Sequence, residues 1–136
     1  MKVELTRRGD YAVRAAVVLA ATDAEQMTGG ALAKATGVPR SYMSQVMGAL
    51  VRAGLVANRR GRLGGYRLSR TPSEISLLDV VEAAEGRAGL RTCVLRGGPC
   101  RRDGPCDVHV AFASAEHAAF EALAAVTLGD LGVRSG

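Results

Sequence analysis

The sequence contains no tryptophan and only two phenylalanines among its 136 residues. Its hydrophobic content is nevertheless 48%, much of it alanine, so such a chain buries little apolar area per residue. A chain of this length is expected to form one domain, with room for one attached element. We therefore expect the surface of a partner chain to complete its core.

The sequence also lacks signals for secretion and for membrane insertion. Residues 1–10 are charged, the apolar stretch at 13–21 is too short to span a bilayer, and no lipidation motif is present. We expect a cytoplasmic protein without a membrane partner. Thiols stay reduced in that compartment, so the three cysteines are not expected to form a disulfide framework.

Charge is distributed unevenly along the chain. Residues 1–70 carry twelve Lys or Arg against four Asp or Glu, whereas residues 71–136 carry six against nine. A basic half joined to a mildly acidic half is typical of a polyanion-binding surface attached to a second module. A solvated arginine-rich surface would show the same totals, so composition alone leaves both interpretations open.

The basic half has the pattern of a helix-turn-helix. The first predicted helix covers residues 6–21. A short helix follows at 30–36, and Gly37 ends it because glycine readily adopts the positive φ of a helix terminus. Pro39 is expected at the first position of a third helix, residues 39–53. The expected apolar stripes are Tyr11, Val13, Ala16, Val17 and Ala20 in the first helix, and Met43, Val46, Met47, Leu50 and Val51 in the third.

A β-hairpin is predicted directly after the helix-turn-helix, with strands at 55–58 and 66–68 and an arginine- and glycine-rich tip at 59–65. A hairpin in this position is a wing. Glycine-rich loops also cradle nucleotide phosphates, but here no helix N-terminus follows the loop and no Lys-Ser/Thr pair completes a P-loop.

The second half is predicted to be two helices joined by a loop. Ser76 and Asp79 have the spacing of a capping box at the start of a helix at 77–84. Residues 86–106 are rich in Gly and Pro and lack periodicity, which predicts a loop. The last helix, at 107–125, has a narrow stripe suited to helix–helix packing, formed by Val108, Phe112, Ala115, Ala119 and Leu123.

The predicted fold is therefore mainly α with a small β-hairpin, a winged helix-turn-helix domain plus a long C-terminal dimerisation helix. We expect the DNA-binding domain at 1–70, and a linking helix with the start of the loop at 71–92. A cysteine loop at 93–106 precedes the dimerisation helix and C-terminal segment at 107–131.

The helix at 39–53 and the wing supply the candidate contacts to double-stranded DNA. Arginine pairs with guanine or phosphate, glutamine with adenine, and serine with either, while a wing arginine reads the minor groove. An ordinary exposed helix face is the alternative, but the charge and the wing favour DNA. The candidate DNA-binding residues are Arg40, Ser41, Tyr42, Ser44, Gln45, Arg59, Arg60 and Arg62.

Cys93, Cys100 and Cys106 lie within fourteen residues of the Gly/Pro-rich loop. Free cysteines are usually buried as small hydrophobic side chains, but this loop has no evident core face. Neighbouring arginines favour thiolates and offset the charge of a thiolate cluster. The spacing lacks the Cys-x2–4-Cys knuckle of structural zinc sites. An iron–sulfur centre is therefore favoured, while zinc and a thiol switch stay open.

Taken together, these residues resemble the Rrf2 family of bacterial transcription regulators, which includes iron–sulfur-assembly, nitric-oxide-sensing and redox-sensing repressors. The resemblance runs from Leu5 to about Leu131. It is carried by Leu5-Thr6, Gly9-Asp10-Tyr11-Ala12-Val13-Arg14, Val38-Pro39-Arg40-Ser41-Tyr42, Gly54-Leu55-Val56, Arg60-Gly61, Gly64-Gly65-Tyr66-Arg67-Leu68, the cysteine triplet and Thr127-Leu128-Gly129-Asp130-Leu131.

The resemblance implies a homodimer that reads a palindromic operator, with Arg60 in the minor groove. It also implies that the three cysteines hold a 4Fe–4S or 2Fe–2S cluster. The fourth ligand is either Asp10 from the partner subunit or His109, and we favour Asp10. At Ser44 the iron–sulfur-assembly regulators carry glutamate, so their target operators cannot be transferred to this chain.

The expected function is that of a dimeric DNA-binding transcriptional regulator of the repressor type. An iron–sulfur cluster that senses nitric oxide, redox state or iron–sulfur status would control promoter binding. A zinc-stabilised or thiol-redox repressor without a cluster is the alternative. A metal-binding or redox enzyme is disfavoured, because only His109 could act as a base near the cysteines and no cofactor motif is present.

Overall fold

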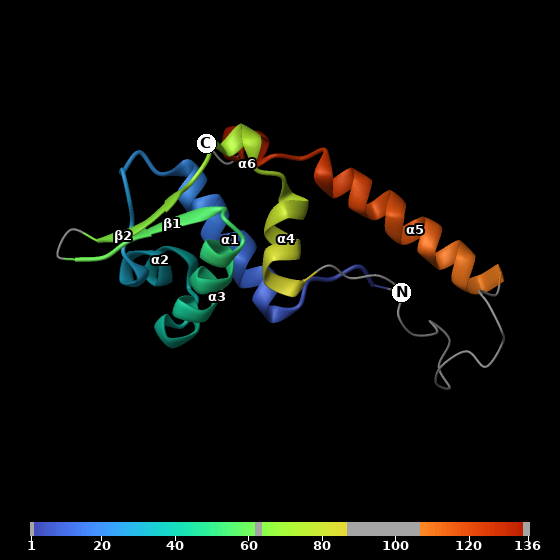
Figure 1. The fold of residues 1–136 in the computed structure, drawn as a ribbon, viewed down its shortest axis with the longest axis horizontal. Coiled ribbons are helices and arrows are strands. Elements are labelled where there is room, and N and C mark those ends of the chain that lie inside the picture. The colour runs from blue at the N-terminus through green and yellow to red at the C-terminus, as the bar shows by residue number, and fades with distance from the viewer. Residues whose placement is uncertain (1, 62–63, 87–106, 135–136) are drawn as a thin grey trace.

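The computed structural model describes residues 2–61, 64–86 and 107–134. These residues form a mainly helical domain with one hairpin, and a long helix, α5, projects away from it (Figure 1). The elements are α1 (Arg7–Ala21), α2 (Gly29–Thr36), α3 (Arg40–Arg52), β1 (Val56–Arg59), β2 (Gly65–Leu68), the 3-10 turn η1 (Pro72–Glu74), α4 (Leu77–Glu85), α5 (Asp107–Ala124) and α6 (Leu128–Arg134).

The helix-turn-helix is formed by α2 and α3, as predicted, and local capping explains its boundaries. The Thr28 hydroxyl accepts the Ala31 N–H, and Gly37 ends α2 with a φ of 76°. The expectation for Pro39 was wrong by one position. It is the N-cap of α3, with extended backbone, and its carbonyl accepts the N–H groups of Tyr42 and Met43. A proline causes no loss at either position, because neither needs a donated N–H.

The wing is a two-stranded antiparallel sheet in which Val56 pairs with Leu68 and Arg59 pairs with Gly65. The connection between α1 and α2 extends it, because Met27 and Tyr66 exchange two backbone hydrogen bonds of 2.9 and 2.7 Å. Gly65 permits this third segment to approach. A Cβ at residue 65 would lie only 2.7 Å from the Met27 carbonyl oxygen.

One hydrophobic core joins the helices to the hairpin and to the C-terminal end of the chain. Its largest fully buried side chains are Leu32, Met43, Val46, Met47, Leu50, Ile75, Val80 and Leu128. Four of them come from α3, so the predicted apolar face of that helix is confirmed, with Val51 only partly buried. The core extends beyond residue 70, because Ile75, Val80 and Leu128 belong to it.

The buried face of α1 differs from the predicted stripe. The side chains that α1 buries are small: Ala12, Ala15 and Ala16, together with Leu19. The larger predicted residues Tyr11 and Val13 lie at the edge of the core and are only partly buried. Close packing of several elements on α1 explains the difference, since alanine lets helix backbones approach more closely than tyrosine or valine does.

The C-terminal segment contains α6, a helix that was not predicted. Thr127 and Asp130 form a reciprocal capping box with hydrogen bonds of 3.0 and 3.2 Å. Two backbone bonds, Leu77 N–H to Val126 O and Leu128 N–H to Ile75 O, fasten this segment beside the start of α4. The predicted capping box of Ser76 and Asp79 is confirmed.

The helix α5 buries none of its residues in the single chain. In the part of the chain that the structure describes, it contacts α4 and leaves Val108, Val110 and Phe112 between 38% and 53% exposed. No helix of the described ranges is long and apolar enough to cross a membrane.

We expect Gly65→Ala to destabilise the fold by about 1–3 kcal/mol, because the new methyl group collides with a backbone carbonyl that the wing needs. The matched control is Gly29→Ala, where the nearest atom to the new Cβ is a Tyr66 ring carbon at an ordinary 3.7 Å. Urea denaturation followed by circular dichroism measures both. Equal stability of the two variants would contradict the close approach of Met27.

Candidate nucleic-acid interface

The exposed face of α3 carries most of the residues predicted to contact base edges. Burial of the opposite face against the core fixes the orientation of the helix. The four predicted residues that it turns to solvent are Arg40, Ser41, Ser44 and Gln45. The structure therefore brings one guanidinium, two hydroxyls and one amide onto a single surface.

Tyr42, the fifth candidate DNA contact on this helix, does not lie in solvent with the other four. It is half-buried and packs against the core. Its ring meets that of Tyr11 edge to face, with centroids 5.1 Å apart and planes at 85°, a favourable arrangement for two aromatic rings. Tyr11, which the sequence placed only in an apolar stripe, thus supports the first turn of α3.

Arg40 lies against the start of α2. A Cβ at Gly30 would lie 3.6 Å from the Arg40 Cζ, so the guanidinium covers this glycine. The N–H groups of a helix start and a guanidinium both favour a negative charge. The start of α2 and the Arg40 side chain therefore combine two sources of positive potential.

The wing places Arg59 and Arg60 in solvent at the end of β1. Arg62 lies outside the described residues. Gly61 has a φ of 113°, and a Cβ at Gly64 would lie 2.4 Å from the Arg59 carbonyl oxygen. Glycine is needed at both positions, which explains how the chain turns tightly beside the arginines.

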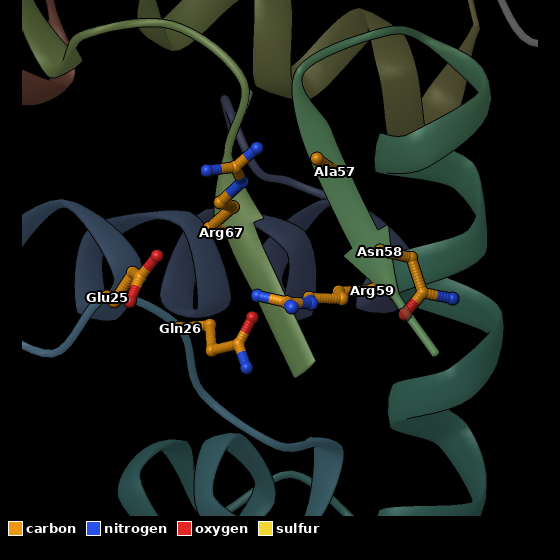
Figure 2. A pocket seen from close by; sticks show the side chains of 6 residues that line it. All are labelled: Glu25, Gln26, Ala57, Asn58, Arg59 and Arg67. Carbon is orange, nitrogen blue, oxygen red and sulfur yellow. The ribbon is translucent and has the colours of Figure 1, made fainter. Parts of the chain in front are cut away.

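The outer face of the wing carries a second arginine that the sequence did not single out. Arg67 pairs with Ala57 and Arg59 pairs with Gly65, so both arginines project from the same face of the sheet. Figure 2 shows them with Gln26 and Glu25 from the α1–α2 connection. Together with Asn58 they line a shallow hollow of about 330 Å³. Strand register, which residue types alone do not reveal, is the signal that identifies Arg67.

These arginines have no protein partner within the described ranges. Within those ranges the side chains of Arg40, Arg59, Arg60 and Arg67 make neither a hydrogen bond nor an ion pair. Four cationic side chains without acidic partners leave the positive charge available to a polyanion.

The predicted metal ligands are only partly described. Cys93, Cys100 and Cys106 lie outside the described residues. Within them, no group of three His, Cys, Asp or Glu side chains is suited to a metal ion. Asp10 lies in the first turn of α1, where its Oδ1 accepts a hydrogen bond of 2.8 Å from Arg14 Nε. This bond, and then the attraction between the two charges, raises the pKa of Arg14.

His109, the other predicted fourth ligand, lies in the first turn of α5 and is half-buried. It lies in the same turn as Asp107, and Asp107 directly follows Cys106 in the sequence. The structure thus places the two candidates on different helices, Asp10 on α1 and His109 on α5.

Comparison with known proteins identifies the family of this chain. The Rrf2 family model, described as an iron-dependent transcriptional regulator, matches residues 5–133. The HTH-type transcriptional regulator NsrR of Geobacillus kaustophilus is 32% identical, with 95% of this chain and 89% of that protein covered.

Two solved structures share the whole architecture. CymR, the global cysteine regulator of B. subtilis, is 25% identical with a TM-score of 0.80, over 98% of both chains. IscR of T. potens is also 25% identical with a TM-score of 0.81, over all of this chain and 90% of that one. Relatives and family are regulators rather than enzymes, so the predicted absence of enzymatic activity is confirmed. The chain belongs to the Rrf2 family of winged helix-turn-helix, DNA-binding transcriptional regulators.

Proposed function

We propose that this regulator is a cytoplasmic homodimeric repressor whose binding to a palindromic operator is controlled by an iron–sulfur cluster. The observation that carries the proposal is the place of the three cysteines in the chain. Cys93, Cys100 and Cys106 follow α4, which packs on the winged domain, and precede α5. In chain order, a group bound by them would lie between the DNA-binding domain and the proposed dimerisation helix.

The proposed operator contacts are those of the exposed face of α3 and the wing. Arg40, Ser41, Ser44 and Gln45 would enter the major groove with Tyr42 at its edge, and Arg59, Arg60 and Arg62 would follow the wing into the minor groove. Support comes from the four unpaired arginines and from the shared surface of α3. Arg67 joins this set as a phosphate contact, because it faces the same side as Arg59.

The proposed dimer forms through α5. An 18-residue helix that buries nothing in its own chain leaves its apolar side chains in water, at an unfavourable free energy. Val108 and Phe112 are four residues apart and each is 38% exposed, so a second copy of the helix could cover both. This element would constitute the dimerisation unit within residues 107–131.

The residues present fit an iron–sulfur cluster by the chemistry of their donor set. Three thiolates with one carboxylate or imidazole suit iron, and the family description as iron-dependent agrees with this choice. When bound, the cluster would supply a reactive iron that nitric oxide, oxidants or iron loss can attack. The weaker oxygen or nitrogen ligand would leave that iron accessible. Both 4Fe–4S and 2Fe–2S forms fit this set.

The proposed switch changes the distance between the two copies of α3 in the dimer. Half-sites of a palindrome require a separation of about 34 Å, one turn of DNA. The segment 87–106 joins α4 to α5, so its arrangement bears on how α4 and the winged domain sit relative to the dimer axis. A differential binding free energy of a few kcal/mol between two such states is sufficient for regulation.

Between the two candidate fourth ligands we favour Asp10 of the partner subunit. Its carboxylate is 43% exposed, and its partner within the chain, Arg14, is a surface residue that it can leave at small free-energy loss. His109 lies close to Cys106 in the same chain and remains the alternative.

For the DNA contacts, we expect Gln45→Ala to lower operator affinity by about 1–3 kcal/mol and to relax the preference at one base pair. Arg59→Ala and Arg67→Ala should instead weaken binding to all sequences and reduce the salt slope by about one. Fluorescence anisotropy at several salt concentrations measures both effects. Lys2→Ala is the control, since Lys2 pairs with Glu4 near the start of the chain. An unchanged salt slope for Arg59→Ala would remove the wing from the interface.

For the dimer, we expect Phe112→Asp to yield monomers and to lower operator affinity at least about a hundredfold, because one half-site binds without the help of the other. Light scattering coupled to gel filtration gives the mass. The matched control is Ser114→Asp, an exposed position two residues along the same helix that introduces the same charge. If Phe112→Asp remained dimeric, α5 would not be the interface.

For the cluster, we expect protein purified without oxygen to be coloured and to contain iron and sulfide, and Cys100→Ser to lose both. Asp10→Ala should alter the cluster spectrum and its reaction with nitric oxide, whereas His109→Ala should leave both unchanged. Colourless protein without iron would contradict the proposal. Zinc without sulfide would instead establish the zinc-stabilised repressor, and metal-free protein with titratable thiols the thiol switch.

A further inference from the structure

We infer that Glu85, the last residue of α4, is a positioning residue for operator binding, because its carboxylate completes the capping box of α1 from a different helix. In an ordinary capping box, an acid three residues after the N-cap accepts the N-cap N–H. Ser76 with Asp79 and Thr127 with Asp130 follow this pattern within α4 and α6.

The capping box of α1 is assembled from two helices. The Thr6 hydroxyl accepts the Gly9 N–H at 3.2 Å, which is the first half of the box. Gly9 has no carboxylate to return to Thr6. The Thr6 N–H donates instead to Glu85 Oε1 at 2.7 Å, so a residue 79 positions away supplies the second half.

Gly9 is what admits this carboxylate. A Cβ at residue 9 would lie 2.9 Å from both Cδ and Oε1 of Glu85. The backbone itself does not need glycine there, because Gly9 is helical and is not among the glycines with positive φ. A glycine inside a helix weakens it relative to alanine, so its presence is explained by the room that it leaves for Glu85.

The capped turn of α1 is directly connected to α3. Tyr11 directly follows Asp10, the last residue of this turn, and its ring packs edge to face on Tyr42 in the first turn of α3. Arg40 and Ser41 precede Tyr42 on the exposed face. The Glu85 carboxylate therefore holds α4 to the turn of α1 that supports the proposed base-contacting end of α3.

The same carboxylate marks the point where the cysteine segment begins. Gly86 follows with a φ of 82° and ends α4. The effect of Glu85 on operator binding depends only on the DNA-binding role of the family. A further role of Glu85, in which it transmits the presence or loss of the cluster from the cysteine segment to α1, rests on the proposed function. The tests below compare each variant with the unchanged chain purified in the same way, and the iron content is measured beside the affinity, so failure of the cluster proposal and failure of this inference are distinguishable.

The contact is tested by a double-mutant cycle on the full chain. Glu85→Ala should lower Tm by about 3–5 °C. Gly9→Ala should also lower it, because the new methyl group displaces the carboxylate from Thr6. In the Glu85→Ala background, Gly9→Ala should raise Tm, since alanine favours a helix once the carboxylate is gone. If the two decreases in Tm were additive in the double variant, the inference would be overturned.

The positioning role is tested by operator affinity, measured well below Tm. Glu85→Ala should weaken operator binding about three- to tenfold while binding to random DNA stays unchanged, because only specific contacts depend on the placement of α3. Glu85→Gln keeps an acceptor for Thr6 and should restore most of the affinity. Asp79→Ala, which removes the α4 capping box, should lower Tm similarly but change operator affinity by less than about twofold. Equal losses of operator affinity in Glu85→Ala and Asp79→Ala would reduce Glu85 to a stabilising residue and overturn the inference.

Discussion

The fold depends on how closely its elements can approach α1. Ala12 and Ala15 are completely buried and Ala16 is 1% exposed, so this face of the helix presents little more than backbone to its neighbours. The helices α2, α3, α4 and α6 and the strand β2 all contact it. Larger side chains on this face of α1 would push α3, α4 and the wing strand β2 away from it at the same time. The small side chains on this face are thus a condition of the packing.

This arrangement separates the candidate DNA-binding surface from the proposed dimerisation helix in space. The wing lies at one end of the molecule and α5 projects at the other, with α1 and α4 between them (Figure 1). The helix α4 contacts α5 on one side and both α1 and α3 on the other. The hydrogen bond from Thr6 to Glu85 and the ring contact of Tyr11 with Tyr42 connect α4 to α3 by way of α1.

Features that depend on residues near each other in the chain were predicted correctly from the sequence. Gly37 and the pair Ser76–Asp79 mark helix ends through bonds spanning only a few residues. At the start of α6, Thr127 and Asp130 have the same spacing as Ser76 and Asp79, although the interior Gly129 disfavours a helix. There Leu128 compensates, since it is buried in the core.

Features that depend on packing could not be obtained in this way. Hydrophobicity selects Tyr11 and Val13 as the inner face of α1, but close approach favours the alanines. The shared face of Arg59 and Arg67 requires the strand register, and the bond from Thr6 to Glu85 joins residues with no local relation. For the candidate site, residue types indicated Arg40, Ser41, Ser44 and Gln45 as exposed, while the half-buried position of Tyr42 emerges only from the packed structure.

The capping of α1 by Glu85 has an evolutionary consequence. A side chain at position 9 and the Glu85 carboxylate would compete for the same volume, so we expect the two positions to change together in related chains. An acid arising at position 9 would cap α1 from within the helix and release α4 from it. Lineages that made this exchange would keep the winged fold while changing how firmly the two helices move together.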